Sequence, residues 1–259
     1  MIVLNEVLYA EEWLEKDVPW KKAGHVLHYV AKYYFYKGYS KDDVREKLNE
    51  YMLRHFEGYN KVLDRELIDK AIASAKGRPM VELDGVCITK AEVEKIQALE
   101  GKQMQRLIFT MLCLAKYHIA VNEKCNYWIT EDTADIFRMA NVSVNEKKQN
   151  EMICELHNLG FIGFASLKKI DNLNIHVLIA EPDSPHEIFV DDFENAGILW
   201  SQYCGKEYIK CDCCGKMVAR TGRRQKYCRK CAKNVNIEKT AQNRKMFDLR
   251  NVKKCNILT

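Results

Sequence analysis

Four cysteines near the C-terminus have the type and spacing of metal ligands. Cys211 and Cys214 form one Cys-x-x-Cys pair, Cys228 and Cys231 form a second, and 13 residues separate the pairs. Such a turn places two thiolates on one side, and Gly215 lets backbone N–H groups point toward the sulfur atoms. Two pairs supply four soft ligands in the tetrahedral geometry that zinc accepts, with no position left for water. We therefore expect a structural Zn²⁺ ion and not a hydrolytic one.

A further cysteine, Cys213, leaves an alternative open. The two-residue spacing favours Cys211 and Cys214 as ligands, with Cys213 pointing away and a redox role for this spare thiol as the alternative. Seven of the 11 cysteines lie between Cys204 and Cys255. Because disulfides are rare in a reducing compartment, such a cluster favours metal over disulfides.

Positive charge is concentrated around these cysteines. Residues 206–259 contain 16 lysines and arginines against 4 acidic residues, a net charge of +12, whereas residues 1–205 contain 25 against 32, a net charge of −7. This segregation favours a polyanionic partner for the basic end, and rigidly held cations suit contacts to phosphate groups. A solvated surface that only confers solubility is the alternative. The candidate phosphate ligands are Arg220, Arg223, Arg224, Lys226, Arg229, Lys230, Arg244 and Lys245.

The segment that carries these residues has a recognisable order of elements. Residues 216–227 predict a hairpin with Thr221 and Gly222 at its tip, and residues 232–251 are compatible with a helix. A cysteine pair, a hairpin and a second cysteine pair that opens a helix resemble a treble-clef or zinc-ribbon module. The resemblance implies that the ion holds the basic residues in a fixed arrangement.

The middle of the chain predicts a second organised unit, at 86–182. Apolar spacing and capping signals predict its elements in order. The first part has a short strand near 77–90, a helix from 90 opened by a Thr89–Glu92 capping box, and a buried helix at 102–119. The second part has a strand at 126–130, a helix at 131–140 capped by Thr130, a turn at 141–144, a helix from 145 opened by a Ser143–Glu146 capping box, and two strands within 161–181. Helix, strand, helix, turn, helix and hairpin, with Leu-His-Asn-Leu-Gly-Phe-Ile at 156–162, resemble a winged-helix domain.

The winged-helix resemblance implies that the third helix enters the major groove of DNA. The candidate contacts are Lys147, Lys148 and Gln149 of that helix, with Asn145 and Asn150 beside them, and Lys168 and Lys169 of the hairpin, with Asn172 and Asn174. Three glutamates on the same helix give it a net charge of −1. A surface that docks on a protein is therefore the alternative.

The N-terminal part predicts helices throughout 18–76, with Ser40 and Asp64 as N-caps. Residues 24–76, with Ala-Ile-Ala-Ser-Ala at 71–75, resemble the small helical module at the C-terminal side of some replicative primases. No primase catalytic motif is present, so the resemblance implies a helper module.

Two further patterns in this part have competing interpretations. His25 and His28 are one turn apart, as metal ligands can be, but no third ligand is apparent and a structural role is favoured. The run Tyr-Tyr-Phe-Tyr at 33–36 is expected in a core, with base stacking as the alternative.

We therefore expect a mainly α-helical (α+β) protein with an N-terminal helical domain at 1–78, a winged-helix domain at 86–182, a connector at 183–204 and a basic zinc-binding module at 205–259. No phosphate-cradling glycine loop, HExxH pattern or nucleophile context is present, which favours a protein without enzymatic activity. No apolar run could cross a bilayer and the N-terminus does not read as a signal peptide, so a cytoplasmic protein with no membrane partner is expected.

The expected function is that of a nucleic-acid-binding accessory protein, with duplex DNA favoured over RNA. The helical module, winged helix and basic zinc tail together resemble accessory proteins of phages and other mobile elements that act in replication or transcription control. The alternative is an interaction factor, such as a phage-borne inhibitor of a host defence complex. In that case the N-terminal helical or winged-helix domain would dock on a host nucleoprotein complex.

Overall fold

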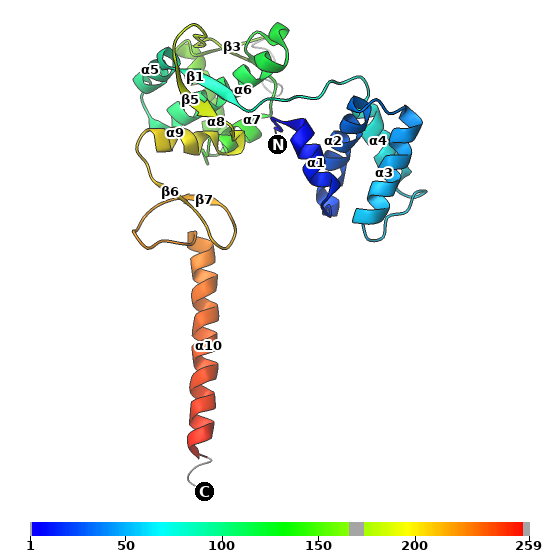
Figure 1. The fold of residues 1–259 in the computed structure, drawn as a ribbon. Helices are drawn as coiled ribbons and strands as arrows, with labels where there is room; N and C mark the ends of the chain where they lie inside the picture. Colours follow the sequence, from blue (N-terminus) through cyan, green and yellow to red (C-terminus); the bar gives the residue numbers. More distant parts are fainter. Residues whose placement is uncertain (1, 166–173, 256–259) are drawn as a thin grey trace.

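Three parts follow one another along the chain: an N-terminal helical domain, a central domain and a small module that continues into a long helix (Figure 1). The computed structural model describes residues 2–165 and 174–255. The expected fold class, mainly helical with small antiparallel sheets, is confirmed. None of the helices in these residues is long and apolar enough to span a membrane.

The N-terminal domain packs its helices around one apolar core. The elements are α1 (Glu6–Leu14), a 3-10 turn η1 (Trp20–Lys22), α2 (Ala23–Tyr36), α3 (Lys41–His55) and α4 (Arg65–Ala75). Helix α2 lies in the middle, against α1, α3 and α4, and Leu27, Leu48 and Ile72 are fully buried. The predicted N-cap Ser40 is confirmed because its hydroxyl accepts the N–H of Asp43. Asp64 stands at the N-cap of α4, but its side chain caps no helical N–H.

A short N-terminal strap, residues 2–6, joins this domain to the central one. The strap pairs with residues 81–83: the Leu83 N–H donates to the Leu4 carbonyl (3.0 Å), and the Glu6 N–H donates to the Val81 carbonyl (2.8 Å). The buried Glu6 carboxylate accepts the Val81 N–H (2.8 Å) and forms an ion pair with the buried Lys32 of α2. The strap, α2 and the interdomain segment are therefore fixed to one another.

The central domain is built around one buried helix. Its elements are β1 (Val86–Thr89), α5 (Lys90–Ala98), α6 (Lys102–Val121), η2 (Glu123–Cys125), β2 (Trp128–Ile129), α7 (Thr133–Met139), α8 (Glu146–Asn158), β3 (Ile162–Phe164), β4 (Ile175–Val177), β5 (His186–Val190), η4 (Phe193–Asn195) and α9 (Ala196–Tyr203). Residues 107–115 of α6 are buried without exception, in agreement with the buried helix predicted there. Strands β2, β4 and β3 form an antiparallel sheet in that spatial order.

Two helix starts in this domain differ from the prediction. Helix α7 begins after Asp132 and not after Thr130. Helix α8 is capped by Asn145, whose side chain accepts the Lys148 N–H (2.9 Å), and not by Ser143. The cap at Thr89 is confirmed, since its N–H donates to Glu92 (2.7 Å) at the start of α5.

Residues 183–204, expected to form a connector, are instead part of the central core. Strand β5 pairs with β1, and α9 packs along α6. Trp200 is 1% exposed and lies against Phe109, with 5.1 Å between ring centroids. Gly197 approaches α7 so closely that a Cβ atom there would lie 2.0 Å from the Ala140 carbonyl oxygen. This acidic segment packs against the central domain because its apolar residues at 193, 196 and 200 are part of the core.

The C-terminal module consists of an antiparallel hairpin, β6 (Tyr208–Lys210) and β7 (Met217–Ala219), a loop and the helix α10 (Arg229–Cys255). The predicted hairpin with its tip at Thr221–Gly222 is wrong, because β7 pairs with β6 upstream of the first cysteine. Helix α10 projects away from the rest of the chain (Figure 1).

Candidate metal centre

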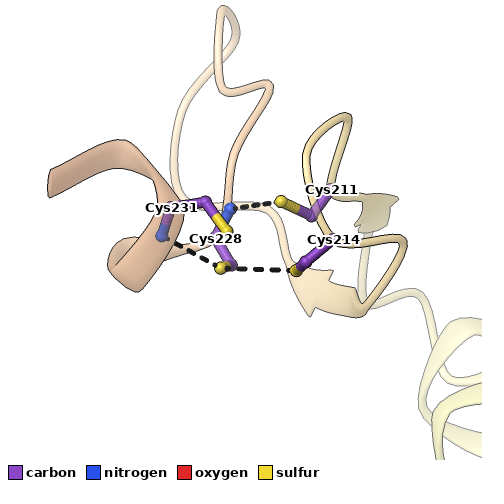
Figure 2. Close-up of side chains that lie close together, drawn as sticks. All are labelled: Cys211, Cys214, Cys228 and Cys231. Atoms are coloured by element: carbon purple, nitrogen blue, oxygen red, sulfur yellow. Dashed lines mark hydrogen bonds between the residues drawn. The ribbon is translucent and has the colours of Figure 1, made fainter. Parts of the chain in front are cut away.

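The four predicted ligands come together at one point between the hairpin and α10. The sulfur atoms of Cys211, Cys214, Cys228 and Cys231 all lie within 4.8 Å of one another (Figure 2). No other group of three or more potential ligands lies together in the part of the chain that the structure describes. The arrangement predicted from spacing is therefore confirmed as a cluster that could hold a metal ion.

The first cysteine pair occupies the turn of the β6–β7 hairpin. The Cys211 N–H donates to the Lys216 carbonyl (2.9 Å), and the Gly215 N–H donates to the Cys211 carbonyl (2.9 Å). Gly215 has a φ of +70°, a conformation that residues with a side chain rarely adopt. This left-handed glycine closes the turn and brings Lys216 back to pair with Cys211.

The second pair is positioned by the start of α10. Cys228 precedes the helix, and Cys231 lies in its first turn. The Cys228 N–H donates to the sulfur of Cys211 (3.2 Å), and the Cys231 N–H donates to the sulfur of Cys228 (3.4 Å), as Figure 2 shows. The Asp212 N–H also donates to the Lys226 carbonyl (3.0 Å), which joins the first pair to the segment before the second.

These N–H groups change the acidity of the thiols that they face. Backbone N–H groups lower the pKa of Cys211 to about 6, that of Cys228 most and those of Cys214 and Cys213 in addition, and the N–H of Cys231 lowers the pKa of Cys228. The pKa of Cys231 is raised, mainly by the hydrogen bond of its thiol with Cys228 and to a lesser extent by that with Cys214. Four crowded sulfurs cannot all ionise by themselves, and a cation among them supplies the compensating charge. The donor set therefore fits a thiolate-binding metal.

The neighbouring cysteines are not part of this cluster. Cys213 is exposed and lies outside the group of four, as the two-residue spacing predicts. Cys204 is also exposed, at the end of α9. The side chain of Cys255 lies outside the described residues.

Most of the predicted phosphate ligands are exposed cations, on the loop before Cys228 and on α10. Arg220 differs: it forms an ion pair with Glu207 (3.2 Å) and donates to the Arg223 carbonyl (2.8 Å), so it holds the loop together. The other described candidates are exposed and form no ion pair with a described carboxylate; they are Arg223, Arg224, Lys226, Arg229, Lys230 and Arg244. Lys245 lies on α10, with its side chain outside the described residues.

Two lysines that the sequence analysis did not select belong to the same surface. Lys210 and Lys216 flank the first cysteine pair, are exposed and form no ion pair within the described chain. Their positions, one residue before Cys211 and two residues after Cys214, were the signal in the sequence. Lys216, with Cys214 and Gly215, also lines a pocket that reaches Arg138 and Asn195 of the central domain.

The candidate nucleic-acid contacts on α8 are less available. Lys147 is exposed, but Lys148 forms an ion pair with Glu151 (3.1 Å). The Gln149 amide is half-buried and donates to the Val144 carbonyl (3.4 Å). Lys168 and Lys169 lie outside the described residues.

The two histidines of α2 have structural partners. His28 shares a hydrogen bond with the Ser74 hydroxyl (2.7 Å), and His25 lies 3.2 Å from the Tyr9 hydroxyl. Burial is the main cause that lowers the pKa of His28, which favours the neutral ring. The structural role favoured by the sequence agrees with these contacts.

No protein-family model, curated protein or solved structure matches this chain. The geometry itself brings four cysteines together, at the start of α10, in a cluster that could hold a metal ion. Within the described residues, lysines and arginines without carboxylate partners lie on the loop before Cys228 and at the start of α10, and this combination is the basis for a functional proposal.

Proposed function

We propose that the protein is a zinc-containing, non-enzymatic nucleic-acid-binding protein whose C-terminal module grips duplex DNA. Tetrahedral zinc with Zn–S bonds of about 2.3 Å requires sulfur–sulfur separations of about 3.8 Å. The sulfurs of Cys214 and Cys228 are 3.9 Å apart. A Cys₄ shell closes the coordination sphere, so the ion would hold the module together and activate no water.

The observation that carries the proposal is the set of exposed, unpaired cations around this centre. A lysine or arginine held by a carboxylate contributes little to phosphate binding, because that contact must first be broken. Arg223, Arg224 and Lys226 on the loop, and Arg229 and Lys230 at the start of α10, have no such partner in the described chain. Phosphate contacts of this kind position a protein on nucleic acid.

Helix α10 extends the same surface. It has 27 residues, which corresponds to about 40 Å, and carries nine lysines and arginines against two acidic residues. No other element of the described chain packs along it. A cationic helix of this length is compatible with the major groove of duplex DNA, which admits an α-helix.

The central domain supports duplex DNA over RNA as the partner. Helices α6, α7 and α8 and the sheet order β2–β4–β3 support our proposal that this domain is a winged helix with α8 as its recognition helix. The major groove of an RNA duplex is too narrow for such a helix. Lys148 and Gln149, two of the three candidate DNA contacts on α8, already bond to other groups of the protein. We therefore assign most of the DNA binding to the C-terminal module.

The test is fluorescence anisotropy with a labelled 20-base-pair DNA duplex and zinc-loaded, full-length protein. At least five phosphate contacts give a log–log slope against salt of about −5. The double variant Arg223→Gln/Arg224→Gln is expected to flatten the slope by about 2, since two contacts are removed. Lys61→Gln/Arg78→Gln, which removes two exposed charges from the N-terminal domain, is the matched control and should leave the slope unchanged.

Two results would refute the proposal. The first is the absence of duplex binding by the zinc-loaded protein at about 50 mM salt, where phosphate contacts are strongest. The second is undiminished binding by a chain truncated after Gln202, which lacks the metal module. Binding that appears only with a host protein present would instead support the interaction-factor alternative.

A further inference from the structure

A second surface with aromatic rings and unpaired lysines lies at the opposite end of the chain, where α2 turns into α3. We call it the tyrosine–lysine surface, and it consists of Tyr33, Tyr34, Tyr36, Lys37, Tyr39 and Lys47. The run at 33–36 was expected in the core, and the structure agrees in part: Tyr34 and Phe35 pack against the N-terminal core, whereas Tyr36 is exposed. Tyr33 and Tyr34 are half-buried, whereas Tyr36 is 53% exposed and Tyr39 is 40% exposed.

The backbone between the helices holds these side chains at a fixed corner. The Lys37 N–H donates to the Tyr33 carbonyl (2.9 Å), and the Tyr39 N–H donates to the Tyr34 carbonyl (3.1 Å). Gly38 has a φ of +86°, the left-handed conformation that ends a helix. Tyr39 then precedes the α3 cap at Ser40 directly, so the exposed rings stand on a rigid turn and not on a loose loop.

Each lysine of the surface lies over two rings. The Lys37 ammonium is 5.0 Å from the ring centroid of Tyr33 and 5.7 Å from that of Tyr36. The Lys47 ammonium is 4.7 Å from the centroid of Tyr39 and 5.6 Å from that of Tyr34. Neither lysine forms an ion pair with a carboxylate of the described residues. Both charges are therefore available to an anion, at positions set by the rings.

We propose that the tyrosine–lysine surface binds single-stranded nucleic acid. Unpaired bases stack on aromatic side chains, and the phosphates between them pair with adjacent cations. Tyr36 and Tyr39 present the exposed rings, and Lys37 and Lys47 supply the charges. Tyr33 is the anchored member, since its hydroxyl donates to Glu11 (3.0 Å). A duplex does not fit this chemistry, because its bases are stacked inside and offer no free face.

The tyrosine–lysine surface and the proposed duplex-binding surface of the C-terminal module consist of different residues and bind different ligands. The protein would therefore hold a duplex through residues near the metal and a single strand through its N-terminal domain. A junction between duplex and single-stranded DNA presents both ligands in one molecule.

The experiment is photo-crosslinking of zinc-loaded, full-length protein to a short oligothymidylate that contains 5-iodouracil, with excess unlabelled duplex to occupy the C-terminal module. Trypsin cleavage after Lys32, Lys37 and Lys41 isolates the peptides 33–37 and 38–41. The expected result is crosslinked nucleotide in these two peptides. In parallel, anisotropy with the same oligonucleotide is expected to show about a 25-fold or greater loss of affinity for Tyr36→Ala/Tyr39→Ala, since each stacked ring contributes about 5-fold or more.

Matched controls separate stacking from general destabilisation. Leu53→Ala removes a side chain of the same domain that is 54% exposed, and it should leave binding of the oligonucleotide unchanged. Lys37→Gln/Lys47→Gln is expected to weaken binding and flatten its salt dependence, whereas Lys61→Gln is not. Crosslinks confined to residues 206–255, or full affinity in the tyrosine double variant, would overturn the proposal and leave the duplex grip untouched. Loss of duplex binding alone would refute the proposed function and leave this site standing.

Discussion

Serine in place of Cys214 is expected to weaken metal binding, whereas serine in place of the adjacent Cys213 is not. The Cys214 sulfur lies in the cluster, 3.9 Å from that of Cys228, while Cys213 lies outside it. Zinc coordination contributes about 10–16 kcal/mol in small modules. Divided equally among four thiolates, one ligand accounts for about 2.5–4 kcal/mol, or about 70- to 900-fold in the dissociation constant.

The assay is competition for the metal against a chromophoric chelator, with Co²⁺ substitution as a second readout. Four thiolates in tetrahedral geometry give intense visible bands and a sulfur-to-cobalt charge-transfer band, which weaken when one thiolate is lost. Cys213→Ser should match the parent protein in both readouts, as should Cys204→Ser at the end of α9. Equal losses from Cys213→Ser and Cys214→Ser would refute the ligand assignment, because the four-sulfur cluster would then be the wrong one.

Three further predictions concern stability. Gly197→Ala is expected to lower the free energy of unfolding in urea by about 3 kcal/mol, since its Cβ would lie 2.0 Å from the Ala140 oxygen. Burial raises the pKa of Glu131, but the hydrogen bond and charge of His118 outweigh it and hold that pKa below its ordinary 4.5. This stabilisation is present above pH 4.5 and is lost as the pH falls through the lower folded value, so Glu131→Gln should lower stability at pH 5.5 and have little effect at pH 3. Chelation of the metal is expected to abolish hydrogen-exchange protection in 206–231 and leave that of the two preceding domains intact.

Each of these predictions has a control or a contrary outcome. Gly24→Ala places a methyl group 3.8 Å from the nearest atom, in helix α2, and should raise stability by up to about 1 kcal/mol. A Gly197→Ala protein as stable as the parent would show that α9 can move away from α7. If Glu131→Gln lowered the free energy of unfolding equally at pH 5.5 and pH 3, the charge of the Glu131 carboxylate would be excluded as the cause. Protection of 206–231 in metal-free protein would mean that the module folds without an ion.

Local signals predicted the parts of the molecule in which a few adjacent residues set the geometry. A Cys-x-x-Cys turn fixes two sulfurs through its own backbone, so the spacing was sufficient to predict which four cysteines cluster and to set Cys213 aside. The same holds for the α3 cap at Ser40 and the α5 cap at Thr89. These features depend little on the rest of the chain.

The structure differs from the prediction where contacts with residues distant in the sequence determine the conformation. Ser143 and Asn145 both fit an N-cap, and the capping-box spacing favoured Ser143, but the backbone enters α8 at Asn145. Residues 208–210 are too few to show strand alternation, so the pairing of β6 with β7 was missed. The prolines and acidic residues of 183–204 indicated a linker, yet Trp200 fills a space against α6 that only the folded domain creates.

The strap also determines how the protein can be divided for study. Ile2 and Leu4 pack against the central core, although they precede the N-terminal helical domain in the chain. A recombinant fragment that starts at residue 86 would leave part of that core facing water and invite aggregation. An excised central domain therefore needs residues 2–5 supplied with it, and a purification tag fused ahead of them would sit at the junction of two domains.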